Sequence, residues 1–128
     1  MKPLYVFWGK VREGKKRGRK LEFPTANIRL SKMIPSGIYA SVVKLKGTSY
    51  QAITFIGEAK TFDETLYQAE TYIFDFTRSI YMYWLSVRLL KKLRENKKFS
   101  SAQILIRQME KDKKNAQRFF TTIGDSCS

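Results

Sequence analysis

Over its first two-thirds, the chain repeatedly alternates apolar and polar residues with a period of two, which is typical of half-buried β-strands. The windows are Leu4–Val11, Ile38–Leu45, Tyr50–Ile56, Gln68–Phe76 and Ile80–Leu90. Lys46–Ser49 connects the second window to the third as in a hairpin, and Thr77–Ser79 is a short polar turn between the last two. Five or six strands in series without intervening helices predict an antiparallel sheet, folded as a compact barrel or sandwich.

The period changes after Phe99. Ser100 and Gln103 have the spacing of a capping box, which marks a helix start. One face of this helix is then marked by residues that recur at helical spacing, namely Leu105, Met109, Asp112, Ala116 and Phe119 or Phe120. We therefore expect a barrel over about 4–90 and one amphipathic helix over about 100–120, with basic residues on its outer face. A length of 128 residues with 43% hydrophobic content predicts a single domain over 1–128.

Composition excludes several classes of site. The chain has no histidine, so histidine-dependent triads and histidine-ligated zinc are excluded, and proton transfer needs another group. The lone Cys127 cannot form an internal disulfide, which favours a reducing, cytoplasmic setting. The N-terminus lacks a signal-peptide pattern, and the apolar run Ile80–Val87 is far too short to span a membrane. We expect a cytoplasmic monomer without membrane contact.

The formal net charge of +14 is concentrated in two segments. Gly9–Lys20 has seven basic residues and one acidic residue, and Arg88–Arg118 has eleven basic and three acidic residues. Strong basicity favours an anionic partner, either nucleic acid or a polyphosphate. A solvated basic surface explains much of the second segment equally well, whereas the glycines of the first segment favour a phosphate site.

The first basic segment, Gly9–Gly18, partly fits a phosphate-binding loop. Gly9, Gly14 and Lys15 have the required spacing, but Lys16 stands where a serine or threonine should hold Mg²⁺. Glycines still allow successive backbone N–H groups to turn toward an anion, and the flanking lysines and arginines add charge. The segment therefore predicts a phosphate cradle other than the standard loop.

Two polar residues follow a proline in Phe23–Asn27. Pro24 stiffens the backbone, and strand alternation places Thr25 and Asn27 on one side. A hydroxyl and an amide oxygen are hard ligands that suit Mg²⁺ carrying water and substrate phosphates. Taken alone the pair is a weak signal, since threonine and asparagine at a strand edge usually have a structural role.

Glu70 shares one strand face with Tyr72, Phe74 and Phe76. A carboxylate at the head of an aromatic face is either the solvated end of the strand or a base placed to accept a proton from a hydroxyl nucleophile. The strand alone does not decide between these interpretations.

Taken in order, the motifs resemble those of the riboflavin kinases. The resemblance extends from about Tyr5 to Ala116, and the ordered set is specific although no single motif is. After the basic loop and Phe23–Asn27 come Pro35–Ala40, Ile56-Gly57 with Thr61-Phe62, Ala69–Phe76, Ile80-Tyr81 and Leu93–Ser100. The resemblance implies a mainly β fold, namely a six-stranded antiparallel Greek-key β-barrel with a C-terminal helix. The implied activity transfers the ATP γ-phosphate to the ribityl 5′-hydroxyl of riboflavin, giving FMN and ADP.

The resemblance also implies roles for individual residues. Glu70 matches the catalytic base and lies at the flavin, and Thr25 and Asn27 match the ligands of Mg²⁺ and phosphate. Arg94, Phe62 and Phe99 are expected at the flavin, with Tyr81 and Trp84 as further aromatic residues available to its ring. The flap over the nucleotide matches Gly14, Lys15, Lys16, Arg17 and Gly18. Nucleic acid is not an expected partner of such an enzyme.

The sequence departs from the family pattern at Glu22, at Ala59-Lys60 and at Met82. Two alternatives stay open: a basic single-stranded nucleic-acid-binding barrel without catalysis, and a flavin-binding protein that has lost turnover. The bacterial family usually carries an adenylyltransferase domain ahead of the kinase. Both a stand-alone kinase and the C-terminal module of a longer bifunctional enzyme therefore fit the sequence.

Overall fold

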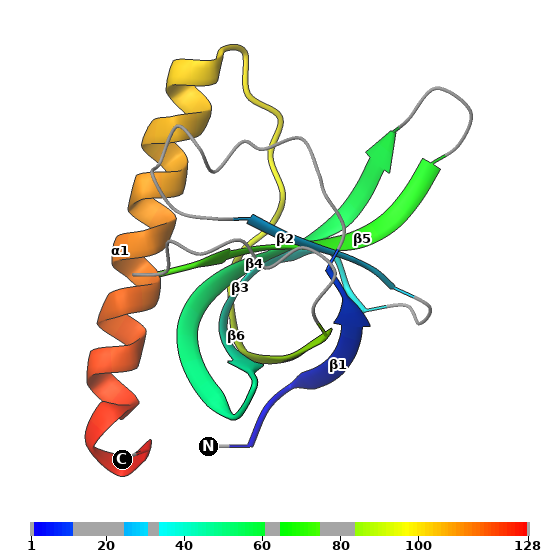
Figure 1. Cartoon of the computed structure of the whole chain (residues 1–128). Coiled ribbons are helices and arrows are strands. Elements are labelled where there is room, and N and C mark those ends of the chain that lie inside the picture. The colour runs from blue at the N-terminus through cyan, green and yellow to red at the C-terminus, as the bar shows by residue number, and fades with distance from the viewer. Residues whose placement is uncertain (1, 12–24, 31–33, 61–64, 75–83, 128) are drawn as a thin grey trace.

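A computed structural model describes residues 2–11, 25–30, 34–60, 65–74 and 84–127. Six antiparallel strands form one sheet in the order β1-β6-β3-β4-β5-β2, followed by a helix (Figure 1). Strands β3, β4 and β5 are consecutive neighbours and β6 returns beside β3, which is a Greek key. The elements are β1 (Tyr5–Lys10), β2 (Thr25–Arg29), β3 (Gly37–Leu45), β4 (Thr48–Lys60), β5 (Thr65–Ile73), β6 (Trp84–Arg94) and α1 (Ala102–Cys127). The predicted mainly β barrel with a C-terminal helix is confirmed.

The two outer strands of the sheet, β1 and β2, approach each other and nearly close the barrel. A Cβ atom at Gly9 would overlap the side chain of Ile28, so this approach requires glycine. Gly9, the first glycine of the basic segment, therefore has a packing role in the barrel wall.

The β3–β4 hairpin is confirmed, with a tighter turn than predicted. Only Lys46 and Gly47 lie between the strands, and their φ angles of 49° and 84° are both positive, as in a type I′ turn. Glycine tolerates this conformation readily, and its twist matches that of the paired strands. The ladder therefore begins at the pair Leu45 and Thr48.

Several strand boundaries differ from the predicted ones. β4 continues to Lys60 because it stays paired with β5, although residues 57–60 show no apolar alternation. β5 begins at Thr65 and ends at Ile73, and Phe74 already lies in a turn. β6 extends past Leu90 to Arg94, so the sheet reaches further than the predicted barrel limit. The expected turn Thr77–Ser79 and the start of the last predicted strand lie outside the described residues.

Alternate residues of each strand fill the barrel interior. Its apolar core includes Ile28, Tyr39, Val43, Ile56, Ile73 and Leu89. Three buried hydroxyl groups cross the interior as a chain, with Ser41 Oγ 2.7 Å from Thr54 Oγ1 and Thr54 Oγ1 2.9 Å from Thr71 Oγ1. Each buried hydroxyl thus has a hydrogen-bond partner, which removes the cost of burying it.

Helix α1 packs lengthwise against the outside of the barrel (Figure 1). Its predicted start is one residue too early: the Ile104 N–H donates to Ser101 Oγ at 3.3 Å, so Ser101 is the N-cap and Ser100 with Gln103 form no capping box. The helix ends at Cys127, beyond the predicted limit of about 120. Its inward side chains and their barrel partners include Met109, Ala116, Phe120, Ala40, Ile53 and Tyr72. No helix formed by the described residues combines the length and apolar character needed to cross a membrane.

Candidate functional site

Glu70 lies on the outer face of the barrel between two paired strands. Its register partners are Asn27 on β2 and Phe55 on β4. Side chains at directly paired positions of antiparallel strands project to the same face and are neighbours. Glu70 is 8% exposed and Asn27 is 3% exposed. The structure therefore places the predicted base and the predicted amide ligand side by side in a largely buried setting.

Tyr72 fixes the orientation of the Glu70 carboxylate. The Tyr72 hydroxyl donates a hydrogen bond to Glu70 Oε1 across the strand face. The Tyr72 ring is fully buried and meets the Phe55 ring edge-on, with ring centroids 5.3 Å apart. Alternation along β5 had put Tyr72 and Glu70 on one face, but only the packed ring shows that the hydroxyl reaches the carboxylate.

Asn27 presents an unsatisfied end of its amide. Its Oδ1 lies 3.5 Å from Gln68 Nε2, and no described residue provides a hydrogen-bond partner for the buried Nδ2. Rotating both amides by half a turn keeps the hydrogen bond between Gln68 and Asn27 and turns Asn27 Oδ1 toward the unpartnered position. An oxygen in that position fits Mg²⁺. Thr25 lies two residues before on β2, opposite Tyr72, and its side chain lies outside the described residues.

Arg94 ends β6 and joins the barrel to helix α1. Its Nε donates to Asp112 Oδ1 at 2.8 Å and its Nη2 donates to Asp112 Oδ2 at 2.7 Å, while Nη1 donates to the Glu95 carbonyl. Asp112 also accepts a hydrogen bond from Gln108 Nε2 at 3.1 Å. The Asp112 side chain is completely buried, so this two-pronged ion pair anchors the helix to the end of β6.

The Arg94 guanidinium also connects aromatic residues on the two sides of the site. It lies 6.0 Å from the centroid of the Phe55 ring and 5.8 Å from that of Phe99. Phe55 is the strand neighbour of Glu70, and Phe99 belongs to the connection that leads into α1. Arg94 and Phe99 therefore lie close to Phe55, the strand neighbour of Glu70. Their contact with a flavin stays a prediction. Sequence reasoning missed the roles of Phe55 and of Asp112 as the partner of Arg94.

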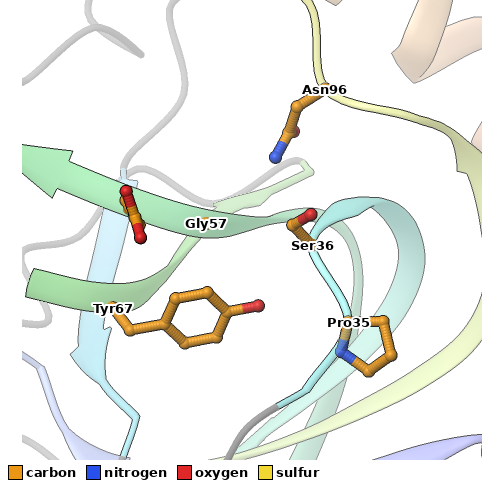
Figure 2. Close-up of a pocket in the computed structure, with 6 residues that line it drawn as sticks. Pro35, Ser36, Gly57, Tyr67 and Asn96 are labelled. Atoms are coloured by element: carbon orange, nitrogen blue, oxygen red, sulfur yellow. The ribbon is translucent and has the colours of Figure 1, made fainter.

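The described residues also form a cavity of about 500 Å³ (Figure 2). It is lined by Pro35, Ser36, Gly57, Glu58, Tyr67 and Asn96. Gly57 pairs with Gln68, two residues along β5 from Glu70, but none of the residues that line the cavity is one of the site residues described above. The volume is that of a small-molecule site.

Gly57 and Asn96 hold the upper wall of the cavity together. Asn96 Nδ2 donates to the Ile56 carbonyl at 3.0 Å, and a Cβ atom at Gly57 would lie only 3.0 Å from that nitrogen. Tyr67 donates to the Ile34 carbonyl, and Figure 2 shows its ring directed toward Pro35. Burial and the nearby Glu58 carboxylate raise the pKa of Tyr67, while Lys92 opposes this shift. Tyr67 therefore remains a hydrogen-bond donor at neutral pH.

Of the predicted site residues not yet discussed, the structure describes only Trp84. Gly14, Lys15, Lys16, Arg17, Gly18, Phe62 and Tyr81 lie outside the described residues. Trp84 is 66% exposed on β6, opposite Lys10 of β1, and that exposure does not fit a residue lining a buried ring slot. The described part of the site therefore consists of Asn27, Glu70, Tyr72, Phe55, Arg94 and Phe99.

The chain matches proteins of established families along most of its length. The family model described as flavokinase, riboflavin kinase, matches residues 1–120. A bifunctional riboflavin kinase/FMN adenylyltransferase from Haemophilus influenzae is 37% identical over 124 residues. That alignment covers 94% of this chain and 40% of the relative, so the chain spans less than half the length of that protein.

Two solved structures resemble the fold. A Streptococcus pneumoniae protein described as a macrolide-efflux protein superposes with a TM-score of 0.78 at 33% identity, covering 90% of this chain and 38% of that one. A riboflavin kinase from Trypanosoma brucei superposes with a TM-score of 0.62 at 24% identity, covering 91% of this chain and 79% of that one, and supports the fold alone. With the family model matching almost the whole sequence, the chain belongs to the riboflavin kinase family.

Proposed function

We propose that this chain catalyses ATP-dependent phosphorylation of the ribityl 5′-hydroxyl of riboflavin, giving FMN and ADP. The observation that carries the proposal is the buried pairing of Asn27 with Glu70, whose carboxylate is oriented by Tyr72. These residues belong to two of the motifs in the ordered set that resembles the family, Phe23–Asn27 and Ala69–Phe76. Family membership makes riboflavin and ATP the substrates to test first.

Glu70 is the proposed base of the transfer. One carboxylate oxygen accepts the Tyr72 hydrogen bond, which leaves the other available to accept the proton of the 5′-hydroxyl. The hydroxyl oxygen forms a bond to the γ-phosphorus as the bond to the β-phosphate oxygen breaks, and ADP leaves. Such transfers depend mainly on positioning and charge neutralisation, so a fixed carboxylate suits the reaction.

Thr25 and Asn27 are the residues proposed to hold Mg²⁺. Water and phosphate oxygens are proposed to complete the ligand set, because Mg²⁺ in proteins usually keeps several waters and binds substrate phosphates. When bound, Mg²⁺ neutralises charge on the transferring phosphate. Asn27 supports this role through its unpartnered amide position, and the Gly14–Gly18 loop is proposed to cover the nucleotide.

We also propose that residues 1–128 form one domain that acts as a monomer in the cytoplasm. The continuous sheet and the packing of helix α1 on it support the one-domain proposal. The relatives' additional adenylyltransferase activity is not assigned to the residues of this chain.

The proposal is tested by incubating the purified chain with riboflavin, ATP and Mg²⁺ and separating the flavins by chromatography. FMN and ADP are expected to form in equal amounts, and FMN formation is expected to stop with EDTA and resume when Mg²⁺ is added in excess. Flavin binding without FMN formation would instead indicate a protein that has lost turnover. Absence of both would refute the proposal.

Tyr72→Phe is expected to lower kcat about tenfold with little change in KM for ATP. The variant loses one hydrogen bond to a charged carboxylate, which is worth about 1.5 kcal/mol or more, and Glu70 then samples other rotamers. Steady-state kinetics give kcat and KM separately. Tyr39→Phe is the matched control, because it removes a buried tyrosine hydroxyl bonded to the Pro35 carbonyl away from Glu70. Equal loss of kcat in both variants would show that Tyr72 acts only on stability.

A further inference from the structure

Both tryptophans of the chain are exposed on one outer face of the barrel. Trp8 on β1 is 69% exposed and Trp84 on β6 is 66% exposed. The register pairs Trp8 with Ser86 and Lys10 with Trp84, so the two indole rings are diagonal neighbours on the same face of this ladder. Burying large aromatic rings is favourable, so two exposed indoles that adjoin each other indicate a surface used for contact.

Three cations surround the tryptophans on this face. Lys10 is directly opposite Trp84, Lys44 on β3 is opposite Ser86, and Arg88 lies two residues further along β6. All three side chains are exposed. Strands β1, β3 and β6 contain no acidic residue. We call Trp8, Lys10, Lys44, Trp84 and Arg88 the tryptophan face.

Helix α1 leaves the tryptophan face open. The helix packs on Leu90 of β6 and Val42 of β3, which lie at one end of this outer surface. Along β6 the row continues from Leu90 through Arg88 and Ser86 to Trp84, away from the helix contacts. Figure 1 shows β1 on the side of the barrel remote from α1.

We propose that the tryptophan face binds single-stranded nucleic acid. Exposed indoles offer planes on which unpaired bases stack, and flanking lysines and arginines neutralise the phosphates. From Trp84 to Arg88 the face measures about 13 Å along the strand, and about 10 Å across β1, β6 and β3, enough for two or three nucleotides. A base-paired duplex keeps its bases stacked on each other, so this surface favours single strands.

The charge of the chain favours nucleic acid over a second copy of the chain as the partner of this face. Two molecules that each carry +14 and meet through basic faces repel each other, whereas a polyanion releases counterions when it binds. The sequence left a single-stranded nucleic-acid-binding barrel open as an alternative but did not locate a binding face, because Trp8 and Trp84 lie far apart in the chain. Pairing of β1 with β6 brings them together.

The two indoles provide their own reporter, since they are the only tryptophans in the chain. Titration with an oligouridylate of about 12 nucleotides, within the range of single-strand sites on small barrels, is expected to quench tryptophan fluorescence saturably. In anisotropy titrations with the labelled oligonucleotide, Trp8→Thr and Trp84→Thr are each expected to weaken binding about fivefold or more. Affinity is expected to fall as salt rises.

A pair of matched charge variants tests the location. Lys44→Gln with Arg88→Gln and Lys111→Gln with Lys114→Gln each remove two exposed cations, but the second pair lies on the outer face of α1. The first pair is expected to weaken binding and to make the slope of log K against log salt concentration shallower by roughly 0.7 per lost phosphate contact. The helix pair is expected to bind like the unmodified chain. Equal weakening by both pairs, no quenching, or a dimer that the tryptophan substitutions dissociate would each overturn the proposal. Circular dichroism confirms that each variant is folded.

Discussion

Replacement of Glu70 by glutamine is expected to lower kcat about 10²- to 10⁴-fold, the usual contribution of a positioned general base. Glutamine has nearly the same shape and retains an oxygen that accepts the Tyr72 hydrogen bond, so the local packing is preserved. It cannot accept the proton of the 5′-hydroxyl. The loss should therefore appear in turnover, with the dissociation constant for ATP close to that of the unmodified chain.

The measurement compares FMN formation rates at saturating substrates with nucleotide binding by calorimetry. Glu110→Gln is the matched control, because Glu110 is exposed on helix α1 and loses the same charge. Glu70→Gln with near-normal turnover would contradict the assignment of the base. A variant that no longer bound nucleotide would show that Glu70 is needed to build the site.

Much of the fold could be predicted because alternation in the sequence reports burial directly. The strands, the hairpin and the helix follow from periods of two and 3.6, and the absence of helices between the strands indicates an antiparallel sheet. Strand ends could not be predicted as well, since β4 and β6 continue as long as a neighbour offers hydrogen bonds, whatever the pattern of their own side chains. The helix start could not be fixed either, because both Ser100 and Ser101 are capping residues, and only the structure shows that Ser101 accepts the hydrogen bond from the Ile104 N–H.

The residue types of the candidate site could be predicted from the sequence, but the contacts between its side chains mostly could not. Motif resemblance identified Asn27 and Glu70, but their pairing depends on the register of β2 against β5. The ion-pair role of Asp112 could not be predicted, because a residue that only packs against the barrel would have the same helical spacing. Contacts between distant segments, such as Arg94 with Asp112, leave no periodic signal in a single sequence.

The ion pair between Arg94 and Asp112 should be the most important polar contact for the position of helix α1. Asp112→Ala is expected to lower the free energy of unfolding by about 3–5 kcal/mol, because it leaves a buried guanidinium without its carboxylate. The Arg94 side chain is only 13% exposed, so water does not readily replace the missing acceptor. Denaturation by urea measures the change. Asp112→Ala with less than about 1 kcal/mol of destabilisation would contradict the anchoring role.

A double replacement separates anchoring from a direct role of Arg94 at the flavin. Arg94→Met with Asp112→Leu removes both charges and fills the space with apolar side chains, which is expected to recover most of the lost stability. If Arg94 serves only to hold α1 and Phe99 in place, FMN formation recovers together with stability. If the guanidinium also contacts the flavin, as the family resemblance implies, the double variant is stable while its KM for riboflavin stays raised. Arg94 then has two roles, because the fork that holds the helix also fixes the guanidinium between Phe55 and Phe99.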